Sequence, residues 1–192
     1  MERTAGYGIS IAKRRVVGKR RELVIPNREV RELFIDLAEE CFQESSRTDL
    51  PRIHRFCDAF PAGDAATVEH MLQEYLWDSI SVRDTAVRRN MKENFYHGMI
   101  LGLLQSQEDW LIQSNAELGQ GYSDISIATS DKTGIIIEIK YAEDGRLEKA
   151  CESALTQIEK KGYAAGLARK GMKHIIRYGI AFWEKECRVV RG

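Results

Sequence analysis

The sequence lacks a long apolar run, a net charge and a nucleotide-binding loop. No run of apolar residues approaches the length of a membrane span, and the charged N-terminus has no signal-peptide core, so we expect a cytoplasmic protein that contacts no membrane. Lysine plus arginine equals aspartate plus glutamate at 29 each, so nucleic-acid binding would need a local basic patch. No GxxxxGK[ST] motif is present, which excludes a nucleotide-binding loop in this chain.

The sequence also has few cysteines, and their spacing excludes the usual zinc and redox motifs. The four cysteines lie at positions 41, 57, 151 and 187, with no CxxC pair. Cys41 and Cys151 fall on apolar faces of expected helices, which favours free, buried thiols. The length of 192 residues suits one domain, or one domain with an appendage, and the composition of 43% hydrophobic and 30% charged residues is globular.

The most informative stretch is a pair of apolar runs, residues 121–127 and 134–140, joined by a polar Thr-Ser-Asp-Lys-Thr-Gly turn. This pattern predicts a β-hairpin. Because side chains alternate between the two faces of a strand, the three odd-numbered isoleucines of the second run share one face, and Glu138 and Lys140 share the other. Asp124 lies in the first run, within reach of the same edge.

Two carboxylates and an ammonium group in one strand pair indicate metal-assisted hydrolysis. Asp124 and Glu138 would bind Mg²⁺, which is usually held by one or two carboxylates together with waters and substrate phosphate, and the carbonyl of Ile139 would add an oxygen. Lys140 would orient or polarise the attacking water, or offset the charge on the phosphate. The alternative is a charged pair at a sheet edge, where lysine blocks aggregation.

The spacing Asp-x(13)-Glu-x-Lys across a hairpin resembles the core motif of the PD-(D/E)XK nuclease superfamily, which includes restriction enzymes, repair nucleases and junction resolvases. Asp124, Glu138 and Lys140 match its three motif positions, and Ser123 stands where the motif has its proline. The resemblance implies a restriction-endonuclease-like α/β sandwich with a mixed central sheet. It also implies hydrolysis of nucleic acid, with DNA as the expected substrate and Mg²⁺ or Mn²⁺ as the cofactor.

The flanking segments 92–104, 154–163 and 178–182 resemble one branch of this superfamily. In that branch the nuclease-like domain forms the C-terminal part of bacterial proteins whose N-terminal part is an AAA-type ATPase-like domain. The branch therefore implies an ATPase domain or protein as a partner, which this chain does not itself contain. It leaves a second interpretation open: a binding or regulatory module that keeps the nuclease fold and serves the ATPase.

Three more side chains complete the candidate site. Glu93 matches an acidic residue that such nucleases supply from the helix before the hairpin, and would be a further metal ligand; the alternative is an exposed glutamate favoured by the helix dipole. His97, four residues later on the same side, would contact phosphate or shuttle a proton, unless it is a packed core histidine. Gln157 matches a glutamine that faces the active site in the family and positions water or a phosphate oxygen; otherwise it is a surface residue.

The chain order predicts three regions. Residues 1–27 are expected to form a small hairpin or linker, with strands at 7–11 and 22–25 and a basic turn between them that either touches nucleic acid or is solvated. Residues 28–85 are expected to be a helical region. Residues 86–192 are expected to be the nuclease-like domain. A chain that begins within a hairpin suggests a fragment, or a short version of a longer protein.

The expected elements follow from the spacing of apolar residues. Their helical periodicity in the middle region predicts three helices, at 30–44, at 50–60 and from a cap at Asp64 or Thr67 to Ile80. The last region reads as helix, three strands, helix, strand and strand, with its first helix at 90–107. This order predicts an α/β fold in which the crossover helix, expected over 147–158, joins two parallel strands by a right-handed connection.

Overall fold

The computed structural model describes the residues 15–17, 20–22, 50–80 and 91–192. Two short strands, β1 (Arg15–Val17) and β2 (Arg20–Glu22), pair antiparallel near the N-terminus. The sequence predicts a turn that includes Arg15, Arg20 and Arg21, but these three residues lie in the two strands. The predicted position of the turn is therefore wrong. The first expected strand, the helix predicted at 30–44 and the predicted boundary between residues 85 and 86 lie outside the described residues.

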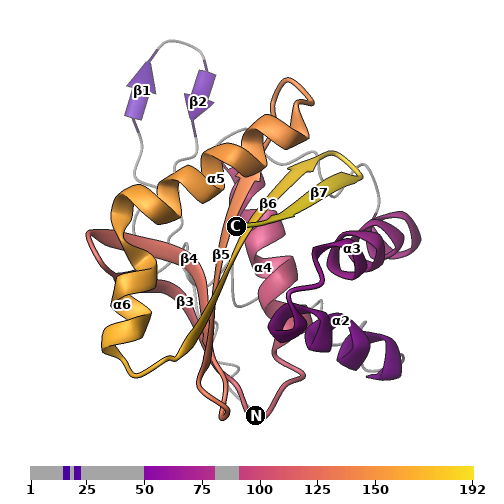
Figure 1. Cartoon of the computed structure of the whole chain (residues 1–192). Coiled ribbons are helices and arrows are strands. Elements are labelled where there is room, and N and C mark those ends of the chain that lie inside the picture. Colours follow the sequence, from indigo (N-terminus) through magenta and orange to yellow (C-terminus); the bar gives the residue numbers. More distant parts are fainter. Residues whose placement is uncertain (1–14, 18–19, 23–49, 81–90) are drawn as a thin grey trace, which may run out of the picture.

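The central element is a five-stranded mixed sheet in the order β3-β4-β5-β6-β7 (Figure 1). Neighbouring strands are antiparallel except β5 and β6, which are parallel. A parallel pair needs a long crossover, and two helices supply it, α5 and α6. The strands are β3 (Leu111–Leu118), β4 (Gly121–Ala128), β5 (Thr133–Tyr141), β6 (His174–Trp183) and β7 (Glu186–Arg191), and the helices are α5 (Leu147–Lys161) and α6 (Tyr163–Arg169).

Helices cover both faces of the sheet (Figure 1). One face packs against α4 (Lys92–Leu104), α2 (Leu50–Ala62) and α3 (Ala65–Ser79), and the other against α5 and α6. The alternation in β5 is as predicted: Ile135, Ile137 and Ile139 join the α2–α3–α4 core, whereas Ile136 joins the α5–α6 core. The predicted restriction-endonuclease-like α/β sandwich is confirmed.

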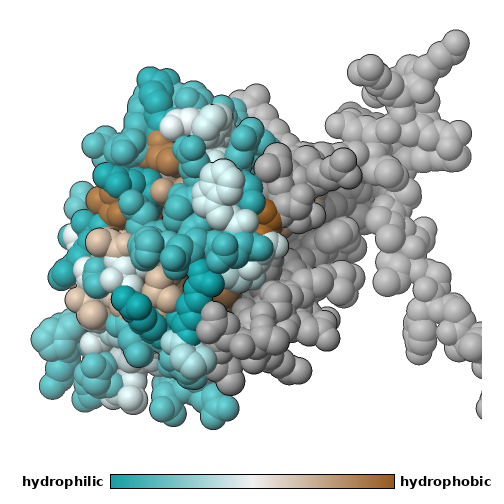
Figure 2. Space-filling view, turned by 90° about the vertical axis from the view of Figure 1, so that its right-hand side faces the viewer, coloured by the Kyte–Doolittle hydropathy of each residue, from teal (hydrophilic) through white to brown (hydrophobic). Residues whose placement is uncertain are grey.

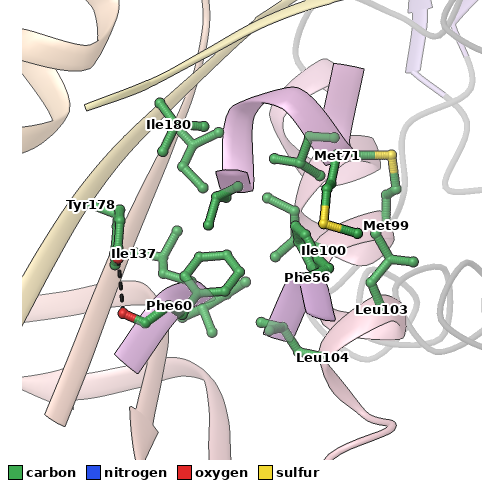
Figure 3. Close-up of a cluster of buried hydrophobic side chains, with 14 of the residues drawn as sticks. Phe56, Phe60, Met71, Met99, Ile100, Leu103, Leu104, Ile137, Tyr178 and Ile180 are labelled. Atoms are coloured by element: carbon green, nitrogen blue, oxygen red, sulfur yellow. Dashed lines mark hydrogen bonds between the residues drawn. The ribbon is translucent and has the colours of Figure 1, made fainter. Parts of the chain in front are cut away.

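The larger core lies where α2, α3 and α4 meet the sheet (Figure 3). Phe60 of α2 packs edge-to-face against Tyr178 of β6, with ring centroids 5.2 Å apart. The hydroxyl of Tyr178 also donates a 2.8 Å hydrogen bond to the buried carbonyl of Phe60. A buried polar group without a partner is destabilising, so this bond fixes α2 to the sheet as well as removing that penalty.

Asp64 is the N-cap of helix α3, because its side chain accepts a hydrogen bond from the Thr67 amide at 3.0 Å. The helix then covers the free edge of β7. Glu69 accepts from the amide of Val189 at 2.8 Å, and Gln73 accepts from the amide of Cys187 at 3.1 Å. Side chains of α3 thus take the place of a sixth strand.

The side of the molecule on which α2 and α3 lie is mainly hydrophilic, with small, separate hydrophobic patches (Figure 2). Within the described residues, no helix combines the length and the apolar character needed to cross a membrane.

The β3–β4 hairpin has a short turn. Strand β3 continues to Leu118 and β4 begins at Gly121, so Gly119 and Gln120 form the turn. Asn115 has a φ of 49°, and at this residue the side chains of β3 change faces. Ser114 contacts His97 of α4, whereas Leu118 packs in the α5–α6 core. The tip of the hairpin therefore bends toward α5 and α6.

Candidate active site

The candidate site lies where β4 and β5 separate. Their last paired residues are Ile125 and Ile137. One residue further on, Asp124 and Glu138 replace the ladder with side-chain hydrogen bonds. The amide of Asp124 donates to Glu138 Oε1 at 3.2 Å, and the amide of Ile139 donates to Asp124 Oδ2 at 2.8 Å. Each carboxylate therefore binds the backbone of the other residue's strand, and the two form a reciprocal clamp.

Two further predicted residues converge on the second oxygen of Glu138. Gln157 of α5 donates from Nε2 to Glu138 Oε2 at 2.7 Å. The ammonium nitrogen of Lys140 lies 3.9 Å from the same oxygen and its side chain is 24% exposed. The structure thus brings together Asp124, Glu138, Lys140 and Gln157, which the sequence had placed on three separate elements.

The electrostatics of this cluster suit a cation. Glu138 is fully buried, and this burial, together with the charge of Asp124, raises the pKa of Glu138 from 4.5 to about 8. The positive charge of Lys140 lowers the pKa of Glu138 but does not cancel the other two effects. A bound cation adds the positive charge that such a carboxylate pair lacks.

The donor set also fits the metal that the sequence resemblance implies. The described residues contain no group of three or more histidine, cysteine, aspartate or glutamate side chains placed to hold a metal ion. Mg²⁺ does not need such a group, because it usually keeps several waters and is held by one or two carboxylates plus substrate phosphate. Asp124 and Glu138 supply those two carboxylates, and Mn²⁺ also prefers oxygen ligands.

Glu93 lies at the margin of the cluster. Its side chain is exposed, and Oε1 accepts a hydrogen bond from the amide of Tyr141 at 3.3 Å. The next residue toward the N-terminus, Lys92, donates from Nζ to the Tyr141 hydroxyl at 2.9 Å and lies over its ring. The start of α4 is therefore tied to the end of β5, and Glu93 contacts the residue that follows Lys140.

His97 lies elsewhere. Its ring is 3% exposed and Nε2 lies 3.3 Å from the hydroxyl oxygen of Ser114 in β3. These two facts favour the packed-histidine alternative.

Tyr163 was missed by sequence reasoning. Its ring is almost fully buried, its hydroxyl donates to the carbonyl of Tyr122 at 2.8 Å, and hydrogen bonding to Gln157 partly offsets the rise in its pKa caused by burial. Gly121 leaves room for it, because a Cβ there would lie 3.2 Å from the Tyr163 hydroxyl oxygen. The only sequence signal is the preceding Gly162, whose φ of 66° ends α5 and starts α6.

The family comparison agrees with this geometry. A family model described as the PD-(D/E)XK nuclease superfamily matches residues 91–192, just over half of the chain. The chain belongs to the PD-(D/E)XK nuclease superfamily. No curated protein and no solved structure gives a significant match. Membership of this superfamily implies binding of nucleic acid, and its nucleases generally use divalent metals. The matched region contains every element of the sheet and all six candidate site residues.

Proposed function

We propose that the chain is a metal-dependent nuclease that hydrolyses phosphodiester bonds in DNA, with Mg²⁺ or Mn²⁺ held by Asp124 and Glu138. The observation that carries the proposal is the cluster around one buried carboxylate, Glu138. Burial and the charge of the Asp124 carboxylate raise its pKa, and the Gln157 amide and the Lys140 ammonium group lie at its Oε2. These are the groups that metal-assisted phosphodiester hydrolysis requires, and they meet at the motif positions of the superfamily.

The side chains have separate roles in this mechanism. A divalent cation at Asp124 and Glu138 would supply positive charge to the scissile phosphate and acidify the attacking water. Lys140 keeps its ammonium group partly exposed at the edge of the cluster, where it can donate a hydrogen bond to that water or to a phosphate oxygen. Gln157 holds Glu138 Oε2 in place and so fixes one ligand, and it would also position water.

Two residues have weaker roles. Glu93 is proposed to support the metal shell through water, because its present contact is with the amide of Tyr141, next to Lys140. The phosphate contact of His97 stays a prediction.

A second function is supported by the reciprocal clamp itself. Asp124 and Glu138 join two strands through backbone hydrogen bonds. A module that had lost catalysis would therefore still need both carboxylates to hold its sheet together. Such a module would bind or regulate a partner, and the resemblance to one branch of the superfamily indicates an AAA-type ATPase.

A cleavage assay with matched lysine variants tests the proposal. Wild type, Lys140→Ala and Lys173→Ala are purified identically and incubated with supercoiled, linear and single-stranded DNA, and with RNA, in Mg²⁺, Mn²⁺ or EDTA. Lys173 is an exposed lysine whose amide bonds the carbonyl of Lys132, next to the first residue of β5, so it lies about 25 Å along the sheet from Lys140. Lysine is the chosen target because replacing either carboxylate with alanine would also break the clamp.

The expected result is metal-dependent cleavage of DNA by wild type and by Lys173→Ala, with loss of cleavage in Lys140→Ala. Equal cleavage by all three proteins would assign the activity to a contaminant or to another site and would refute the mechanism. If none of the three proteins cleaved any substrate although each was folded, the partner-binding module would be favoured. Binding to an ATPase would then be measured instead.

A further inference from the structure

The exposed Tyr122 lies beside the candidate site and takes no part in the mechanism proposed above. The side chain of Tyr122 is 58% exposed, although it lies in β4, two residues before Asp124. Within the described residues, two other large hydrophobic side chains are exposed to a similar degree, Trp77 on α3 and Leu111 at the opposite end of the β3–β4 hairpin. Tyr122 is the one of the three that adjoins the carboxylates.

The backbone that carries this ring is held rigidly on its inner side. The Tyr122 carbonyl accepts the 2.8 Å hydrogen bond from the Tyr163 hydroxyl, and Tyr122 pairs with Glu117 of β3. At the tip of the hairpin, the amide of Gln120 donates to the carbonyl of Lys161 at 2.8 Å. The hairpin is therefore docked on the last turn of α5 and the first turn of α6. A binding residue on such a rigid support loses little conformational entropy when a ligand stacks on it.

The ring points away from this support. Gly121 faces the Tyr163 hydroxyl, and Ser123 is fully buried, so Tyr122, which lies between them in the strand, is directed to the opposite, solvent side. Residues two apart in a strand lie about 7 Å from each other. A nucleotide stacked on the ring would therefore place its own or the adjoining phosphate near Asp124.

We propose that Tyr122 is a stacking platform for an unpaired DNA base next to the cleaved phosphate, which rests on the nuclease function proposed above. The substrate is then single-stranded or frayed DNA, because a base inside a continuous duplex already stacks on its neighbours and cannot present its face to the ring. The recognition is tolerant of sequence, since every base has a π-face.

Binding of a labelled strand tests the proposal. All variants are made in the Lys140→Ala background, so that bound DNA is not cut, and are titrated in Mg²⁺ against a fluorescein-labelled single strand and against a blunt-ended duplex with G·C-rich ends, with fluorescence anisotropy as the readout. Tyr122→Ala should weaken single-strand binding by about 5- to 150-fold, the range found when one base–aromatic stack is removed. Tyr122→Phe and Tyr122→Trp should retain it, and duplex binding should change little. Leu111→Ala removes a side chain that is 62% exposed from the far end of the hairpin and should change neither.

The outcomes separate this inference from the nuclease function. Single-strand binding by Tyr122→Ala equal to that of the parent, or an equal loss on both ligands, would overturn the stacking role and leave the nuclease function standing if wild type still cuts DNA. A parent that binds neither ligand, together with a wild type that cuts nothing, would overturn both.

Discussion

We expect Glu138→Gln to stabilise the metal-free protein at neutral and alkaline pH while abolishing metal-dependent activity. Burial and the charge of Asp124 raise the pKa of Glu138 from 4.5 to about 8. Between these two pH values the folded chain holds a proton that the unfolded chain releases. The stability contributed by this carboxyl group is therefore complete below pH 4.5 and is lost as the pH rises through 8.

The size of the effect follows from the same shift. At pH 7 the pH lies about 2.5 units above the unfolded-state pKa of 4.5 but still below the folded-state pKa of about 8. Over this interval the free energy of unfolding falls by about 1.4 kcal/mol per pH unit, which amounts to on the order of 3 kcal/mol. A neutral glutamine avoids this loss. Its oxygen can accept from the Asp124 amide as Glu138 Oε1 does, and its NH₂ group can donate to Gln157 once the Gln157 amide turns over.

Urea unfolding in EDTA at pH 5 and at pH 8 measures this difference. Wild type and Glu138→Gln should differ by less than about 1 kcal/mol at pH 5, and the variant should be more stable by several kcal/mol at pH 8. Glu152→Gln, in which an exposed glutamate of α5 is replaced, controls for the loss of one negative charge. Adding Mg²⁺ should stabilise wild type at pH 8 but not Glu138→Gln. If the free energy of unfolding changed with pH in the same way in wild type and Glu138→Gln, the raised pKa of Glu138 would be refuted as the cause.

Four other substitutions have defined outcomes. Gln157→Ala removes the 2.7 Å donor to Glu138 and should raise the Mg²⁺ concentration for half-maximal cleavage by about 10- to 100-fold; an unchanged metal titration would contradict this role. Gly119→Ala should lower the free energy of unfolding more than Gly162→Ala. Both glycines have positive φ, which costs an alanine about 1–2 kcal/mol, but only a Cβ at Gly119 would overlap the Lys161 carbonyl. Tyr178→Phe removes the donor to the buried Phe60 carbonyl and should cost about 1–3 kcal/mol, so wild-type stability in urea would count against it.

Much of the fold could be predicted because its signals are local. The period-two pattern of β5 and the polar turn before it depend only on neighbouring residues, and β5 has the faces that the pattern indicated. Helix α6 was not predicted, since seven residues rich in alanine and glycine carry no clear periodicity. The change of faces at Asn115 depends on one backbone torsion angle, which residue identity does not determine, so the bend of the hairpin toward α6 could not be foreseen.

The candidate site was only partly predictable. The spacing of Asp124, Glu138 and Lys140 on two paired strands indicated that they would lie together, and they do. The role of the two carboxylates in joining the strands was not predicted. They bind the backbone of the neighbouring strand where the backbone pairing of β4 and β5 ends, and the sequence carries no signal for the point at which that pairing ends. Tyr163 was missed because it reaches the site from α6, across a change of helix direction at Gly162.

The contacts between α3 and β7 join the region that the family model matches to a helix that precedes it. The matched region begins at residue 91, whereas the acceptors for the amides of Cys187 and Val189 come from two side chains of a helix that ends at Ser79. A polypeptide limited to 91–192 would thus present β7 as a bare strand with unsatisfied donors. Such strands recruit other strands, so we expect the fragment 91–192 to self-associate more readily than a chain that includes α3.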